Sequence, residues 1–147
     1  MYKSNRKSKY NNQKIYIDGF KFDSKEEGKY YLHLKELKEK GIIKKFNLQP
    51  KFELQPKFKD KDGNNHRNIS YILDFEVFYA DGLYEVVDVK GQATSEAKIK
   101  RKMFIYKHPN IEIKWLCYVK KRGGWICYFE NQKMIEAEKK EKKVIFL

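Results

Sequence analysis

The chain has 147 residues, of which 41% are hydrophobic and 16% aromatic, enough for one domain with a buried core. It contains no run of 18 apolar residues, and its first residues carry no apolar segment. We therefore expect neither a membrane-spanning helix nor a standard secretory signal, and we expect a cytoplasmic protein. Cys117 and Cys127 have neither CxxC spacing nor companion histidines, which argues for reduced thiols over a disulfide framework or a zinc site.

Positive charge dominates the chain. The formal net charge is +13 at pH 7, which favours a polyanionic partner, most simply nucleic acid. Residues 1–14, MYKSNRKSKYNNQK, hold five positive and no negative side chains and show no apolar periodicity. We therefore expect a disordered basic arm over 1–14 and a single domain over 15–147.

A hairpin and a helix begin the predicted domain. Residues 15–22 predict a short hairpin with an Asp-Gly pair at its turn. A helix follows, because Ser24 and Glu27 have capping-box spacing and apolar residues then recur at helical intervals until Gly41.

Strands and a basic helix occupy the middle of the chain. Residues 46–59 contain two Gln-Pro pairs, which exclude a central strand at the prolines but allow an edge strand between them. Residues 68–79 and 83–90 each predict one strong strand, and the tight turn Ala-Asp-Gly joins them. A basic helix with Thr94 or Ser95 as its cap comes next.

The last third predicts two strands and a helix. Residues 111–119 and 125–129 read as strands around a KKRGG turn, and residues 131–143 read as a charged helix. The order helix, three strands, helix, strand favours an α/β fold with a mixed central sheet flanked by helices.

The stretch YEVVDVKG at residues 84–91 places Asp88 and Lys90 on one face of a strand that otherwise looks buried. Burying such charges costs several kcal/mol per ion, so a strand keeps them only with good partners or for a chemical purpose. A satisfied ion pair at the sheet end is the structural alternative to a catalytic role.

The turn between the two strong strands decides which residues face each other. A three-residue loop with Gly82 in the left-handed position pairs Tyr79 with Leu83 and sets Asp74 directly across from Asp88. Two facing carboxylates repel each other. A divalent cation between them would explain the arrangement, because magnesium prefers carboxylate oxygens and keeps water for a phosphate substrate.

Glu27 is the third candidate acid. It shares the inward apolar face of the first predicted helix, whereas Glu26 falls on the solvent side. Its place in the capping box is an equally good structural explanation.

Asp74 in LDF, followed by a short hairpin and DVK at residues 88–90, resembles the PD-(D/E)xK nuclease signature. Five segments in order, FDSKEEGKYY, QPKFELQPKF, SYILDF, EVVDVKG and KIKRKMF, are similar to an uncharacterised family of small phage and prophage proteins in that superfamily. Leu73 precedes the first acid, where the signature has proline. The resemblance implies a restriction-endonuclease-like core and metal-dependent DNA cleavage inside a host cell.

The resemblance also assigns roles. Glu27, Asp74 and Asp88, with the carbonyl of Val89, would hold one or two magnesium ions, for which manganese is the expected substitute. Lys90 would orient the attacking water or stabilise charge in the transition state. Glu27, Asp74, Asp88 and Lys90 are thus the candidate catalytic residues.

Further residues are candidates for contact with DNA. Lys98, Arg101 and Lys102 lie within one turn of each other on the basic helix, where they favour phosphate contacts, although a solvated helix face explains them too. Arg67 is a further candidate. Gln49 is a candidate second-shell residue at the acids, although Gln-Pro is also ordinary edge-strand chemistry.

No recognisable base-reading motif is present, which favours a structure-selective or nonspecific nuclease. Resemblance to phage junction resolvases points to branched DNA of the Holliday-junction type as substrate. The sequence does not decide whether the protein forms a homodimer.

Two rival classes of function remain. One is a non-catalytic nucleic-acid-binding module in which Tyr71, Tyr79 and Tyr84 stack on bases. The other is a small phage adaptor whose charge reflects lysine bias.

Overall fold

A computed structural model describes residues 13–145 of the chain. The basic arm expected over 1–14 falls almost entirely outside these residues and stays a prediction. The helices are α1 (Lys25–Glu39), α2 (Ser95–Lys107) and α3 (Tyr128–Ile145). The central sheet consists of β3 (Ile43–Leu48), β8 (Phe75–Tyr79), β9 (Tyr84–Val89), β10 (Glu112–Val119) and β11 (Gly124–Cys127). The remaining strands are β1 (Ile15–Ile17), β2 (Phe20–Phe22), β4 (Lys51–Gln55), β5 (Phe58–Lys59), β6 (Asn65–His66) and β7 (Ile69–Ile72).

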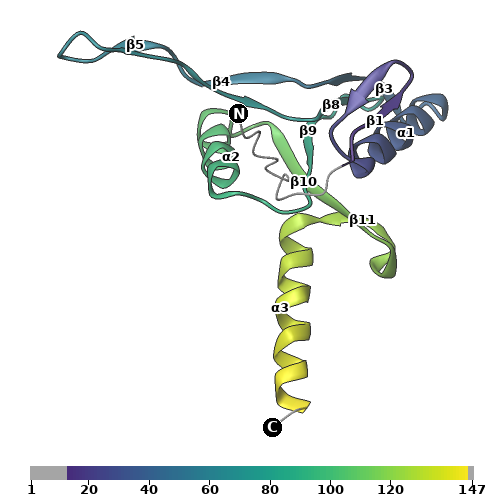
Figure 1. Cartoon of the computed structure of the whole chain (residues 1–147). Coiled ribbons are helices and arrows are strands. Elements are labelled where there is room, and N and C mark those ends of the chain that lie inside the picture. Colours follow the sequence, from purple (N-terminus) through teal and green to yellow (C-terminus); the bar gives the residue numbers. More distant parts are fainter. Residues whose placement is uncertain (1–12, 146–147) are drawn as a thin grey trace, which may run out of the picture.

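The central sheet is mixed. Its strand order is β11-β10-β9-β8-β3, with β9 and β10 parallel and the other neighbours antiparallel. The chain passes through α1, the strands β3, β8 and β9, then α2 and the parallel strand β10 (Figure 1). The predicted α/β class and mixed sheet are therefore confirmed.

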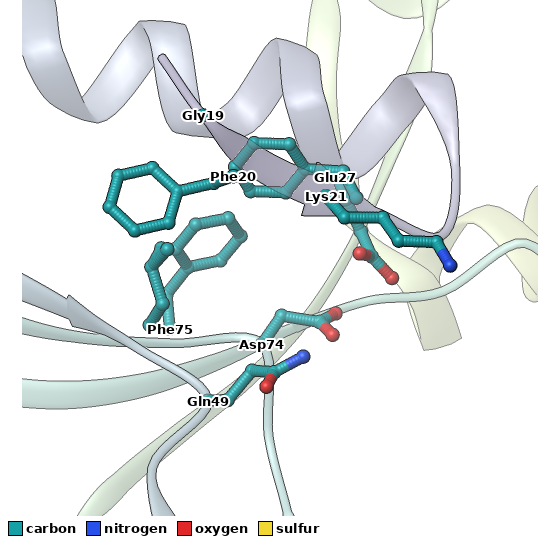
Figure 2. A pocket seen from close by; sticks show the side chains of 9 residues that line it. Gly19, Phe20, Lys21, Glu27, Gln49, Asp74 and Phe75 are labelled. Atoms are coloured by element: carbon teal, nitrogen blue, oxygen red, sulfur yellow. The ribbon is translucent and has the colours of Figure 1, made fainter. Parts of the chain in front are cut away.

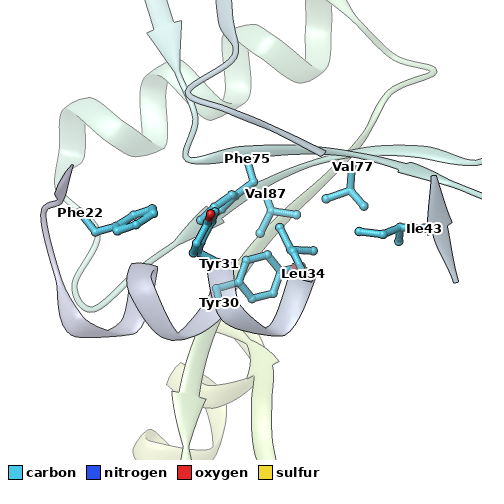
Figure 3. Close-up of a cluster of buried hydrophobic side chains, with 8 residues drawn as sticks. All are labelled: Phe22, Tyr30, Tyr31, Leu34, Ile43, Phe75, Val77 and Val87. Atoms are coloured by element: carbon cyan, nitrogen blue, oxygen red, sulfur yellow. The ribbon is translucent and has the colours of Figure 1, made fainter. Parts of the chain in front are cut away.

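The two faces of the sheet bury separate hydrophobic clusters. The first joins α1 to the sheet and consists of Phe22, Tyr30, Tyr31, Leu34, Ile43, Phe75, Val77 and Val87 (Figure 3). The second joins α2 to the sheet and consists of Leu54, Tyr71, Leu73, Val86 and Phe104. Val86 and Val87 enter different clusters because successive side chains of a strand point to opposite faces.

Local signals set several element boundaries. Ser24 caps α1 by accepting from the Glu27 N–H at 3.1 Å, and Thr94 caps α2 by accepting from the Ala97 N–H at 3.1 Å. Gly41, just beyond α1, has φ +74°, which favours glycine. One boundary was predicted wrongly: the strand expected over 125–129 ends at Cys127, because α3 begins at Tyr128.

The single strand expected over 68–79 is also wrong, because it breaks between β7 and β8. β8 pairs with β3 and β9, whereas β7 pairs with β4 outside the central sheet. Gln49 has φ +52° and precedes Pro50, so the neighbouring chain bends at the same point. The Leu73 N–H donates to the Pro50 carbonyl, and the Gln49 N–H donates to the Asp74 carbonyl. Asp74 lies at this shared bend.

Beyond the bend, the chain forms a two-stranded ribbon. Its base is the pair β4 and β7, and its outer part is the pair β5 and β6. Figure 1 shows the ribbon projecting away from the sheet and the helices. We refer to residues 51–72 as the ribbon.

Two further expectations concern the described residues. Cys117 and Cys127 are free thiols, as predicted. None of the helices between residues 13 and 145 combines the length and apolar character that crossing a membrane requires.

Candidate active site

The hairpin of β8 and β9 has the predicted register. Phe75 pairs with Val87, and the pairing continues to Phe78 and Tyr84. The Tyr79 N–H donates to the Leu83 carbonyl at 2.9 Å. Gly82 has φ +92°, the left-handed conformation that a three-residue loop requires. Continued by one pair beyond Phe75, this register sets Asp74 across from Asp88.

Two backbone hydrogen bonds hold the facing acids together. The Asp74 N–H donates to Oδ1 of Asp88 at 3.0 Å, and the Val89 N–H donates to Oδ2 of Asp74 at 2.8 Å. Each carboxylate therefore accepts from the backbone of the opposite strand. This mutual bonding fixes both side chains at the end of the hairpin, where β8 bends away from β7.

Asp88 is the deeper acid of the two, with 2% exposure. Its Oδ2 lies 3.1 Å from Nζ of Lys90 and accepts from the Tyr71 hydroxyl at 2.7 Å. The Tyr71 hydroxyl in turn accepts from the indole N–H of Trp115 at 2.8 Å. Sequence analysis did not identify Tyr71 and Trp115 as site residues, because their contacts depend on the parallel pairing that sets Trp115 of β10 beside Asp88 and on β7 reaching the same place.

The surroundings of Asp74 disfavour its ionised form. Burial, the Asp88 carboxylate and the Glu27 carboxylate raise the pKa of Asp74 from 3.8 to about 9, against the opposing effects of the Val89 N–H and Lys90. In the metal-free site, burial and the repulsion between these carboxylates therefore keep Asp74 protonated at neutral pH. A cation at Asp74 would relieve this repulsion.

Glu27 reaches the same place from α1. Its carboxylate and that of Asp74 line a pocket of about 370 Å³, and Figure 2 shows the two groups pointing toward each other. Burial raises the pKa of Glu27, although the Asp23 N–H that donates to its carboxylate has the opposite effect. The N–H of Glu27 completes the cap of α1, as expected, while its side chain faces Asp74; its role as a ligand stays a prediction.

Gln49 lines this pocket as well, and its side chain lies beside Asp74 in Figure 2. Its φ of +52° is unusual for a residue with a Cβ, and such strain tends to occur at functional sites. Lys21 of β2 also lines the pocket, which sequence analysis did not predict. The hairpin of β1 and β2 therefore forms one wall of the site.

The donors at this site fit a hard divalent cation by their chemistry, since Asp74, Glu27 and Asp88 offer carboxylate oxygens. Within residues 13–145, however, no three His, Cys, Asp or Glu side chains are already grouped as a metal site. Both oxygens of Asp88 accept hydrogen bonds, and one of them also faces Lys90. Asp74 and Glu27 are the acids that face the open pocket.

The basic residues expected to contact DNA have different environments. Lys98 and Lys102 are exposed on α2, which fits a phosphate contact and a solvated helix face equally. Arg101 is half-buried, and its guanidinium carbon lies 4.7 Å from the ring centre of Phe129 and 5.5 Å from that of Trp115. Its main contacts are therefore with aromatic faces, which the helical spacing alone does not reveal. Arg67 is exposed on the ribbon, away from α2.

The tyrosines proposed for base stacking have other partners. Tyr71 is buried, with its hydroxyl on Asp88. The Tyr79 hydroxyl donates to Glu85, and the Tyr84 hydroxyl donates to Glu76 at 2.7 Å. Tyr71 is thus unavailable for stacking on bases, which removes one support for a non-catalytic binding module.

Replacing Tyr71 with Phe tests the hydrogen-bond chain behind Asp88. The variant loses the donor to Asp88 and leaves the indole N–H of Trp115 without its acceptor. Its free energy of unfolding should therefore be about 1 to 3 kcal/mol lower than that of wild type. Urea denaturation followed by tryptophan fluorescence measures this change. Tyr16→Phe is the matched control, because Tyr16 is 71% exposed. Equal stability of the two variants would show that the hydrogen bonds of the Tyr71 hydroxyl contribute nothing to the free energy of unfolding.

Comparison with known protein families identifies the family of this chain. Residues 7–124 match the family described as "Protein of unknown function (DUF1064)". The chain belongs to this DUF1064 family. No curated protein and no solved structure shows significant similarity to it. The matched range includes Glu27, Asp74, Asp88 and Lys90 and ends at the start of β11, so the candidate active site lies within the part that defines this DUF1064 protein.

Proposed function

We propose that this DUF1064 protein is a divalent-metal-dependent endonuclease of the PD-(D/E)xK type that hydrolyses phosphodiester bonds in DNA. One observation carries the proposal: Asp74 and Asp88 face each other across a hairpin, with Lys90 at 3.1 Å from Asp88 and Glu27 opposite Asp74. Acids that face a polyanionic substrate weaken its binding unless a cation neutralises them. A purely DNA-binding surface has no use for such a cluster.

Magnesium, or manganese in its place, would be held by Asp74, Glu27, Asp88 and the Val89 carbonyl. Such an ion polarises a phosphoryl oxygen and lowers the pKa of bound water. Lys90 remains beside Asp88 and supplies the positive charge that stabilises the developing negative charge on phosphate. Tyr71 and Trp115 hold the Asp88 carboxylate in one orientation from behind.

The order of elements around the sheet supports the same assignment. A helix, three antiparallel strands, a helix and a parallel strand follow one another, in agreement with the restriction-endonuclease-like core that the sequence resemblance implies. Asp74 directly precedes the second of these strands, β8, and Asp88 lies near the end of the third, β9. This placement supports the nuclease assignment without depending on the short motif alone.

Branched DNA is the substrate that we propose, in line with the resemblance to junction resolvases. The exposed Lys98 and Lys102 on α2 would contact phosphates without regard to sequence. The rival proposal is a non-catalytic nucleic-acid-binding protein. The charge of +13 favours it equally, but the facing acids do not.

The test uses the full chain with supercoiled plasmid and with a synthetic four-way junction, each with magnesium, with manganese or with EDTA. We expect cleavage only with metal, and faster cleavage of the junction than of a duplex of the same sequence. Binding without cleavage under all conditions would support the non-catalytic alternative. Equal cleavage of junction and duplex would contradict the preference for branched DNA while leaving the nuclease assignment intact.

A further inference from the structure

The ribbon starts at the candidate active site. Gln49 and Asp74, which lie beside each other at the bend, are the residues from which its two strands depart. A strand rises about 3.3 Å per residue, so the segment from Gln49 to Phe58 spans roughly 30 Å. This length approaches one turn of B-DNA, which is about 34 Å.

The base of the ribbon is held firmly by α2. Leu54 and Phe52 of β4 pack into the second hydrophobic cluster, with the rings of Phe52 and Phe104 4.9 Å apart. Nζ of Lys107 also donates to the Glu53 carbonyl at 2.7 Å. The ribbon is thus anchored at its base while its outer part projects from the molecule, as Figure 1 shows.

The outer part of the ribbon has two different faces. Phe58 pairs with His66, and their rings stack at 4.6 Å on one face. Since side chains alternate along a strand, Lys59 of β5 belongs to the opposite face from Phe58. Lys57 and Arg67 adjoin Phe58 and His66 just outside the two strands, and all three basic residues are exposed. We call these three residues the basic face. Asp60 and Asp62 lie nearer the turn, where Asp60 accepts from backbone N–H groups and contacts His66.

We propose that the ribbon is an arm that lies in the major groove of duplex DNA on one side of the site, with the basic face toward phosphates. The major groove of B-DNA admits a two-stranded β-ribbon, whereas a single strand offers no such groove. Only the placement of the arm beside a cut in the DNA rests on the proposed function. The contact with duplex itself stands on the shape, anchoring and charge of the ribbon.

The test compares two triple variants in metal-free buffer, so that no cleavage occurs. Lys57→Gln/Lys59→Gln/Arg67→Gln removes the basic face. Lys139→Gln/Lys142→Gln/Lys143→Gln removes the same charge from α3, which projects in another direction in Figure 1. The probes are fluorescent hairpin-capped duplexes of about 8 and about 24 base pairs, shorter and longer than the one-turn reach of the ribbon, and a single strand of the longer length.

The basic-face variant should bind the longer duplex roughly 10- to 100-fold more weakly at physiological salt, and its salt slope should fall by about 2.7. Arg67→Gln alone should lower that slope by about 0.9. The α3 variant should keep the wild-type slope. Wild-type protein should bind the longer duplex more tightly than the short one, and the basic-face variant should lose that difference.

Three results would overturn the proposal: equal losses in the two triple variants, wild-type binding by the basic-face variant, or an equal loss on single strand and duplex. Thermal melting of every variant shows that it is folded. Cleavage with magnesium is measured on the same proteins. If wild type binds with the expected length dependence but never cleaves, the nuclease proposal fails and the duplex-binding arm stands.

Discussion

Replacing Asp74 with Asn should abolish metal-dependent cleavage and raise the melting temperature of the metal-free protein at pH 8. Asn keeps an oxygen that accepts from the Val89 N–H, and it presents an amide that cannot ionise toward Glu27. Mutating a residue that only supports a metal ligand typically lowers activity roughly 10- to 100-fold. Removing the ligand Asp74 itself should lower activity more than that. The measurements are junction cleavage and differential scanning calorimetry.

The stability effect follows from the pKa of Asp74, which burial, Asp88 and Glu27 raise from 3.8 to about 9. Between these two values, folded protein keeps a proton that the unfolded chain has released. The free energy of unfolding therefore falls as pH rises through this window. Asn removes this loss, so the variant should gain about 1 to 2 kcal/mol at pH 8, or roughly 3 to 6 °C. Near pH 4 the gain should vanish.

Asp62→Asn is the matched control, because Asp62 is exposed near the end of the ribbon. It should leave cleavage unchanged and show no comparable gain in stability between pH 4 and pH 8. An Asp74→Asn protein that cleaves like wild type would refute the assignment of Asp74. A variant less stable than wild type at pH 8 would show that the carboxylates do not repel each other in the folded state.

Lys90→Met should remove cleavage and also destabilise the protein. Nζ of Lys90 lies 3.1 Å from the Asp88 carboxylate, whose side chain is only 3% exposed. Removing the cation strands a buried charge, which costs about 2 to 4 kcal/mol here because the lysine side chain is itself 21% exposed. Met retains aliphatic contact with Trp115, over which the lysine lies. Chemical denaturation and junction cleavage check the two effects.

Lys114→Met provides the matched control for Lys90. Lys114 lies 2.6 Å from Glu85, the other buried acid of β9, whose side chain is 6% exposed. This pair lies away from the candidate active site, so the variant should lose stability while it retains cleavage. Loss of stability without loss of cleavage in Lys90→Met as well would reduce the Asp88 and Lys90 pair to a structural ion pair.

The sequence by itself determined the features that depend on neighbouring residues. Ser24 and Thr94 cap their helices through side-chain oxygens that reach only the next turn. Gly82 sets the loop between β8 and β9, and the period of two in a strand then carries that register to Asp74 and Asp88. The α/β class and the facing acids followed from such short-range rules.

The tertiary structure alone decided which distant segments meet at these acids. Trp115 joins Asp88 because β10 pairs in parallel with β9, and Tyr71 reaches the same carboxylate from β7. Arg101 turns toward Trp115 because α2 covers that face. The break at Asp74 is bonded to the strained Gln49, which lies between β3 and β4, so residues 68–79 read locally as one strand. Such contacts join residues far apart in sequence, and local propensity and periodicity carry no information about partners at that distance.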